Sequence, residues 1–363
     1  MNNKTPLIHI TRRMDIGRPR AYAYRAAAII LAFIVCGIVT MVLTGENPLD
    51  VYSAMFTGAF GSSRKIWALL QNLAILLCVG LALAPAFRMR FWNLGGDGQV
   101  LAGCIAAAAC MMFLSGALPN VLLIIVTLIA AVCAGALWGF IPAFFKAKWG
   151  TNETLFTLMM NYVAAQLASF FITSWSKDGS AKIGIINQNT QIGWFPEIGN
   201  KYMMFVIVAV ILAVLMFIYM KYTKHGYEIS VVGESERTAR YIGIKVRKVI
   251  IRTMLISGAI CGLTGFFLVS AKDHTLTTTM VGGRGFTAVI VAWLAKFNPF
   301  TMILTAFLIV FLSQGCNQIT TALELNSSFG DIITGIILFF IIGSEFFINY
   351  RIHFRKSSKK EAA

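Results

Sequence analysis

The amino-acid sequence predicts an all-α integral membrane protein, a polytopic bundle of about ten transmembrane helices, some broken or short, with both termini cytoplasmic. Hydrophobic residues make up 58% of the 363 residues and charged residues only 13%, whereas soluble domains carry about 25% charged residues. Long apolar segments recur along the chain, and Lys and Arg gather in the short polar breaks between them. The net charge of +16 therefore indicates membrane topology. Nucleic-acid binding, which needs basic residues clustered on one folded face, is not expected.

Ten apolar segments are long enough, or nearly long enough, to cross a bilayer, which takes about 20 residues for roughly 30 Å of hydrocarbon. Residues 285–296 are too short for an ordinary span, and 94–114 begins inside a glycine cluster. We expect both to be half-helices or broken helices, which membranes tolerate only where protein or a cavity lines them, so the span count is eight to ten. The predicted segments are 22–44, 66–87, 94–114, 118–145, 154–175, 202–220, 253–271, 285–296, 299–316 and 331–350.

The distribution of basic residues agrees with this count. With ten spans and a cytoplasmic N-terminus, 24 of the 31 Lys and Arg residues fall on the cytoplasmic side, as the positive-inside rule requires. We therefore expect a basic N-terminal segment at 1–21, one transmembrane domain at 22–350 with a cytoplasmic loop at 221–252, and a basic cytoplasmic tail at 351–363.

Enzymatic chemistry is not expected in this chain. The polar breaks are too short to bury a core of their own, and no GxxxxGK[ST] phosphate-binding loop occurs, so any ATP would be hydrolysed by a partner. The seven cysteines contain no CxxC pair, and the four histidines are isolated from one another. We expect no catalytic residue, no metal site and no cofactor in the chain itself.

The cytoplasmic loop contains a short predicted helix at 236–242. Ser235 can cap its start, Glu236 and Arg240 are spaced to form an i,i+4 ion pair, and Gly243 is placed to end it in a left-handed conformation. Ala239 and Ile242 share one apolar side of it. A helix this short is not stable alone in water, so it packs either on lipid head groups or on a cytoplasmic partner.

The stretch "WNLGGDGQVLAGC", residues 92–104, places polar side chains among glycines where the third segment begins. A carboxylate at a helix start meets about half a unit of positive charge from the helix dipole. We therefore expect Asp97 to cap the free amides at the start of the third span, close to the cytoplasmic end. The glycines would let the chain break and pack closely.

A second glycine cluster, "VGGRGFTAVIVAWLAKFNP" at 281–299, echoes the first, and the two segments run in opposite directions through the membrane. Inverted repeats produce such pairs, and their broken helices flank transport paths. Polar residues inside a membrane face the bundle interior, where they join helices or line a wet path. The residues that we expect at the path or its gate are Asn93, Gly95, Gly96, Asp97, Gly98, Gln99, Asn152, Glu153, Asn161 and Phe286.

Five stretches in order along the chain carry a family resemblance. They are "GENPLDVYSAMFTGAFGS", "LALAPAFRMRFWNLGGDGQVLAG", "WGFIPAFFKAKWGTNETLFTLMMNYVA", "GYEISVVGESERTARYIGIKVRKVIIRTMLISGAICGLTG" and "GRGFTAVIVAWLAKFNPF". Together they resemble the membrane permease subunits of ABC importers for simple sugars, branched-chain amino acids and nucleosides. The first and third look most like the nucleoside permeases. The sequence departs from the family pattern at Asp97, where Glu is typical, which leaves the exact solute open.

The resemblance implies a path for a small polar solute, most like a nucleoside, driven by ATP that a separate subunit hydrolyses. A simple sugar is the alternative solute, and an ion-coupled secondary carrier is the alternative class, since carriers also use glycine-broken helices. The resemblance also implies that the short helix couples to the ATPase. The coupling residues would be Glu234, Ser235, Glu236, Arg237, Thr238, Ala239, Arg240, Tyr241, Ile242 and Gly243.

The implied partners follow from the same resemblance. They are an ABC ATP-binding subunit that holds ATP and Mg, a second permease subunit that is identical or homologous, and an extracytoplasmic substrate-binding protein or lipoprotein. The lipid bilayer around the chain would be the bacterial cytoplasmic (inner) membrane.

Overall fold

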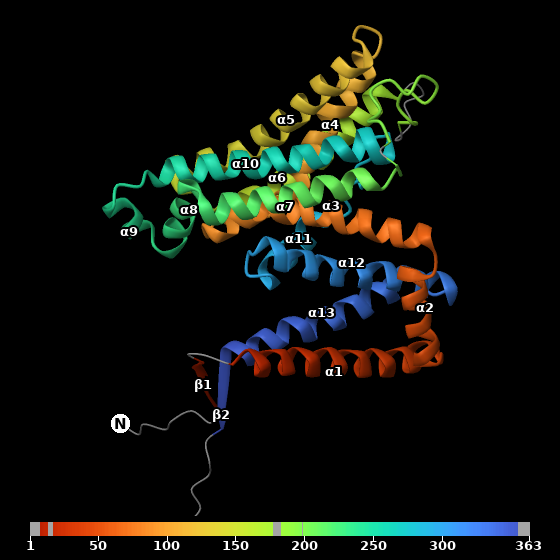
Figure 1. The fold of residues 1–363 in the computed structure, drawn as a ribbon, viewed down its shortest axis with the longest axis vertical. Helices are drawn as coiled ribbons and strands as arrows, with labels where there is room; N and C mark the ends of the chain where they lie inside the picture. Colours follow the sequence, from red (N-terminus) through yellow and green to blue (C-terminus); the bar gives the residue numbers. More distant parts are fainter. Residues whose placement is uncertain (1–7, 14–16, 177–182, 198, 355–363) are drawn as a thin grey trace, which may run out of the picture. The chain divides into compact units, whose positions relative to one another are not determined.

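The computed structural model describes residues 8–13, 17–176, 183–197 and 199–354 (Figure 1). Of the basic segments predicted at the two ends, residues 1–7, 14–16 and 355–363 lie outside the described residues. Contacts within the chain define two compact units. Unit 1 combines Met1–Lys65 with Phe311–Ala363, and unit 2 is Ile66–Val310.

Unit 1 is a small set of helices in which the first and last spans lie side by side. It contains β1 (Ile8–Arg12), α1 (Arg18–Thr44), α2 (Pro48–Phe60), the second half of α12 (Pro299–Ala322), α13 (Ser327–Asn349) and β2 (Tyr350–Phe354). α1 packs along α13, and β1 pairs antiparallel with β2 so that Ile10 lies opposite Ile352 (Figure 1). The strand pairing was not expected from the sequence.

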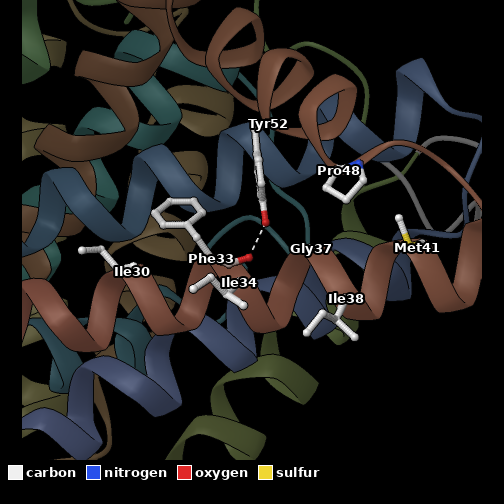
Figure 2. Close-up of a pocket in the computed structure, with 8 residues that line it drawn as sticks. All are labelled: Ile30, Phe33, Ile34, Gly37, Ile38, Met41, Pro48 and Tyr52. Carbon is white, nitrogen blue, oxygen red and sulfur yellow. Dashed lines mark hydrogen bonds between the residues drawn. The ribbon is translucent and has the colours of Figure 1, made fainter.

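A turn between α1 and α2 makes an apolar groove on unit 1. Gly45 ends α1 with a φ of 71°, and the Asn47 side chain accepts a hydrogen bond from Leu49 N at 3.0 Å to begin α2. Figure 2 shows the groove, about 430 Å³ in volume, in which the Tyr52 hydroxyl donates to the Phe33 carbonyl. Its other lining residues are Ile30, Ile34, Gly37, Ile38, Met41 and Pro48. Their apolar character suits contact with lipid acyl chains.

Unit 2 holds the remaining spans and the loop that joins them to a short helix. Its elements are most of α3 (Ser63–Arg88), α4 (Gly96–Phe113), α5 (Asn120–Trp149), α6 (Glu153–Trp175), α7 (Met203–Tyr222), α8 (Lys224–Glu234), α9 (Glu236–Tyr241), α10 (Val246–Phe267), the π-helical turn η1 (Leu268–Asp273), α11 (Arg284–Leu294) and the first half of α12. Small residues bring its centre together. A Cβ added at Gly135 of α5 would overlap the carbonyl oxygen of Gly258 on α10, and one at Gly262 would overlap that of Ala131. Such close backbone approach is typical of helix packing in membranes.

Within the described part of the chain, nine helices are long and apolar enough to cross a membrane, and α11 is a shorter apolar helix of 11 residues. The all-α polytopic class and the expected number of spans are thereby confirmed, as is the half-length of the segment predicted at 285–296. The segment predicted at 94–114 as a half-helix or broken helix is instead α4, an unbroken helix of 18 residues that is counted among the nine, because its apolar run continues to Phe113. The protein is a multi-pass membrane protein, and the cytoplasmic placement of its termini stays a prediction.

Candidate functional site

The predicted cytoplasmic helix is present as α9, at one end of unit 2 beyond α8 (Figure 1). The Ser235 hydroxyl accepts a hydrogen bond from Thr238 N at 3.2 Å, and Arg240 pairs with Glu236 at 2.9 Å. Gly243 has a φ of 87°, the left-handed conformation that glycine adopts without strain. The cap, the ion pair and the glycine stop are confirmed, and the helix ends one residue earlier than predicted.

One side of α9 is presented to its surroundings. Of the predicted apolar side, Ala239 is fully buried, whereas Ile242 is half-exposed. Tyr241 is 92% exposed, and Arg237 beside it is exposed as well. An aromatic ring and a guanidinium therefore project from a helix of six residues, and the aliphatic Ile242 is exposed directly after its end.

α8 fixes this helix to the spans on either side. Arg252 of α10 forms an ion pair with Glu228 of α8 at 2.8 Å, and both side chains are largely buried. A Cβ added at Gly233, at the end of α8, would overlap the carbonyl oxygen of Arg88, the last residue of α3. α9 is therefore linked through α8 to the ends of α3 and α10.

The chain between α3 and α4 is non-helical and tied down by a buried amide. Asn93 is fully buried, and its Oδ1 accepts hydrogen bonds from Gly95 N at 3.0 Å and from Gln99 Nε2 at 3.3 Å. Its Nδ2 donates to the Ser257 hydroxyl of α10 at 3.3 Å. Asn93 and Gln99 therefore join the start of α4 to α10.

Two residues of α6 hold the start of α4 from the other side. The Thr157 hydroxyl accepts from Leu94 N at 3.1 Å. The Asn161 amide accepts from Gly98 N at 2.8 Å and donates to the Leu94 carbonyl at 2.8 Å. Sequence reasoning did not single out Thr157 or Ser257, although the i,i+4 spacing of Thr157 and Asn161 places them on one face of a helix.

The Asp97 carboxylate caps a different helix from the one that the sequence suggested. Gly285 N donates to Asp97 Oδ1 at 2.7 Å, and Gly285 lies in the first turn of α11. At the start of α4, Asn93 accepts from Gly95 N and Asn161 accepts from Gly98 N instead. The expectation that Asp97 caps the third span is therefore wrong, because the starts of α4 and α11 meet and the carboxylate reaches across to the free amide of α11.

This meeting point also lies deeper than expected. Gly98 contacts Asn161, which is eight residues into α6 and so roughly 12 Å from that end of the helix at 1.5 Å per residue. Asp97 is thus inside the bundle rather than at its surface. Two helix dipoles point at it, and Arg284, which donates to Asn72 Oδ1 at 3.2 Å, interacts with it electrostatically. These groups offset the cost of an acid within the membrane.

The remaining predicted path residues lie at two places. Asn152 caps the start of α6 by accepting from Thr154 N and Leu155 N, and Glu153 pairs with Lys146 of α5 at 2.7 Å. Both therefore stand about two turns from the meeting point. Phe286, next to Gly285, is 43% exposed. The assignment of these residues to a path stays a prediction.

At the opposite end of unit 2, residues 183–197 fold onto η1. Trp194 stacks on His274 with ring centroids 3.7 Å apart and donates to the Ile186 carbonyl at 2.8 Å. Burial lowers the pKa of the His274 imidazole, and the nearby Asp273 and Glu197 carboxylates act in the opposite direction. The stacked histidine is therefore favoured in its neutral form.

Comparison with known proteins gives the relatives of this chain. It is 31% identical to the guanosine ABC transporter permease protein NupP of Bacillus subtilis (strain 168), over 87% of this chain and 92% of that protein. It is 28% identical to the nucleoside ABC transporter permease protein NupB of Lactococcus lactis subsp. cremoris, over 86% and 88%. It is also 27% identical to the glucose ABC transporter permease protein TsgB13 of Haloferax volcanii, over 89% and 88%. No solved structure matches the chain. Residues 65–342 match the family described as "Branched-chain amino acid transport system / permease component", and the chain belongs to this family.

Proposed function

We propose that this chain is the permease subunit of an ATP-driven ABC importer that carries nucleosides across the bacterial cytoplasmic membrane. The observation that carries the proposal is the near full-length similarity to two permeases named for guanosine and for nucleosides. A family profile that covers residues 65–342 supports the importer class.

The geometry of α9 supports an external motor. Its exposed Tyr241, Ile242 and Arg237 form a compact surface suited to a groove on an ATP-binding subunit, where ATP and Mg would be held. α8 and its contacts with Arg88 and Arg252 give that subunit a stiff connection to α3 and α10. Closure of the ATPases would then be transmitted to the spans, as alternating access requires.

The meeting of α4 and α11 supports a path close to this point. Helices that start inside a membrane protein, as α11 does, commonly lie beside the solute path. A second permease subunit, identical or homologous, would complete the path, and an extracytoplasmic binding protein or lipoprotein would deliver the solute to the opposite end from α9.

Two other functions are favoured by particular observations. The similarity to a glucose permease favours a simple sugar as the solute. The meeting of α4 and α11 favours an ion-coupled carrier, which would need no ATPase. The exposed face of α9 has no evident role in such a carrier.

Uptake by cells that contain the transporter distinguishes these functions. Uptake of labelled guanosine and uridine should stop with orthovanadate or after loss of the ATPase partner, and it should not be reduced by excess glucose. Uptake that survives vanadate and collapses with a protonophore would refute the importer class. Vanadate-sensitive uptake of glucose in place of nucleosides would refute the solute assignment.

A further inference from the structure

The exposed face of α6 differs from that of α5. On α5 the exposed side chains follow one line along the helix and are all apolar or weakly polar: Val121, Ile125, Ile129, Cys133 and Leu137. Such a face suits lipid acyl chains. On α6 the exposed face is mixed: it carries the apolar Leu155, Met159, Val163 and Phe170 and, beside them, a line of polar side chains over three turns. We define the α6 stripe as Tyr162, Gln166, Ser169 and Thr173, all exposed.

These four residues share one helical face. Their spacings of four, three and four residues keep them in line along the helix. Tyr162 is 63% exposed, and neither its hydroxyl, the Gln166 amide nor the Ser169 hydroxyl has a hydrogen-bond partner within the part of the chain that the structure describes. Thr173 donates to the Ser169 carbonyl at 3.0 Å. The stripe therefore presents unpaired donors and acceptors outward from a membrane-spanning helix.

The stripe lies near the middle of α6. α6 runs from Glu153 to Trp175, so Tyr162 and Gln166 are each about 3 Å from its midpoint at 1.5 Å per residue. Lipid offers no hydrogen bonds at that depth, and an unpaired amide there is strongly unfavourable. Water, a polar solute or another protein must therefore meet it.

The stripe also adjoins the meeting point of α4 and α11. Asn161, which holds Gly98, is followed directly by Tyr162, and Gly285, which binds Asp97, is followed directly by the exposed Phe286. Tyr162 of α6 and Phe286 of α11 are thus each one residue away from a group that holds the start of α4. Aromatic faces with hydroxyl and amide groups beside them suit a flat base joined to a hydroxylated sugar.

We propose that the α6 stripe is the solute-facing wall of the translocation path, where its hydroxyl and amide groups exchange hydrogen bonds with a nucleoside. The identity of the solute rests on the proposed function, whereas the assignment of the α6 stripe to a water-filled path does not. Asn161 faces α4 and holds its start in place, and the α6 stripe, which begins at the next residue, faces the solute.

Cysteine accessibility in the assembled transporter tests the wall. Single cysteines at Tyr162, Gln166 or Ser169 are treated with a charged methanethiosulfonate in membrane vesicles, with Ile125→Cys and Ile129→Cys as matched lipid-facing controls. The native Cys133 on the same α5 face supplies an internal control. Because only the thiolate reacts and it forms only in water, the α6 positions should label at least about tenfold faster than the α5 positions.

Two further measurements test the identity of the solute separately from the position of the wall: protection of the cysteines from labelling by added solute, and the KM for uptake. Guanosine should slow labelling at Gln166→Cys, and Gln166→Leu should raise the KM for uptake about tenfold, the effect of losing one hydrogen bond of typical strength. Ile129→Leu should leave the KM unchanged. Fast labelling that glucose slows and nucleosides do not would support the wall and refute the nucleoside assignment.

Labelling at the α6 positions as slow as at Ile129→Cys would overturn the proposal. If copies of Gln166→Cys also formed disulfides with each other in that case, the α6 stripe would be a contact between permease subunits and not a path.

Discussion

Replacing Asp97 tests the link between α4 and α11. The carboxylate accepts one charge-assisted hydrogen bond, from Gly285 N at 2.7 Å. Hydrogen bonds to charged groups contribute about 1.5–3 kcal/mol and neutral ones about 0.5–1.5 kcal/mol. Asp97→Asn keeps an acceptor oxygen and should lower the free energy of unfolding by about 1–1.5 kcal/mol on this difference. Asp97→Ala leaves a buried N–H unpaired and should lower it by about 2–3 kcal/mol.

Thermal unfolding of the purified chain in detergent, with uptake measured in parallel, checks both parts of this reasoning. Asp50→Asn is the matched control, because Asp50 is an exposed acid in the first turn of α2, where its interaction with the helix dipole is worth about 0.3–1 kcal/mol. We expect Asp97→Asn to retain uptake and Asp97→Ala to lose it together with stability. Normal unfolding but no uptake in Asp97→Asn would refute the capping role, and an Asp97→Ala chain as stable as the original would refute the energetic argument.

Three further perturbations follow from local geometry. Gly258→Ala should destabilise the chain by about 1–3 kcal/mol because its Cβ overlaps a carbonyl of α5. Gly335→Ala on α13 has open space at its Cβ and should be neutral or stabilise the chain by up to about 1 kcal/mol. Equal shifts in Tm for the two variants would contradict this reasoning. Gly243→Val places a β-branched residue at a φ of 87° and should lower the number of nucleosides transported per ATP hydrolysed in vesicles. Gly243→Asn should retain this ratio, because asparagine tolerates the left-handed conformation. An unchanged ratio in the valine variant would argue against coupling through α9. Because the neutral form of His274 is favoured when its loop is docked, the undocked state binds more protons, so docking should weaken as pH falls through about 6.5. Trp194 fluorescence should report this loss, and the same pH profile in His274→Gln would rule out the histidine as its cause.

The parts of the structure that the sequence predicted well depend on neighbours in the chain. The cap of α9 needs only Ser235 and the amide three residues on, and its glycine stop needs only Gly243. Span lengths follow from runs of apolar residues, and α11 was expected to be short because its own run is short. Each of these signals lies within about one or two helical turns.

The parts that it did not predict depend on distant contacts. Asp97 and Gly285 are 188 residues apart, and either helix start was a plausible target for a capping carboxylate. Local reasoning chose the nearer one. β1 pairs with β2, more than 300 residues away along the chain. Neither strand has a local sequence pattern that predicts it, and the sequence around both indicated only basic segments. Tertiary contacts decided both outcomes.

The largest difference concerns what polar residues inside the membrane do. Composition places Asn93, Asn161 and Gln166 in one class of buried amides, but the structure divides them by the partners that they find. Asn93 and Asn161 use their amides to hold the start of α4. Gln166 has no partner among the described residues and is exposed. Hydrogen bonds of Asn93, Asn161 and Asp97 link α4 to α10, α6 and α11, so a displacement of the end of α3 by α9 would act on these helices together. We infer that these hydrogen bonds transmit the motion and that the unpaired side chains beside them act on the solute.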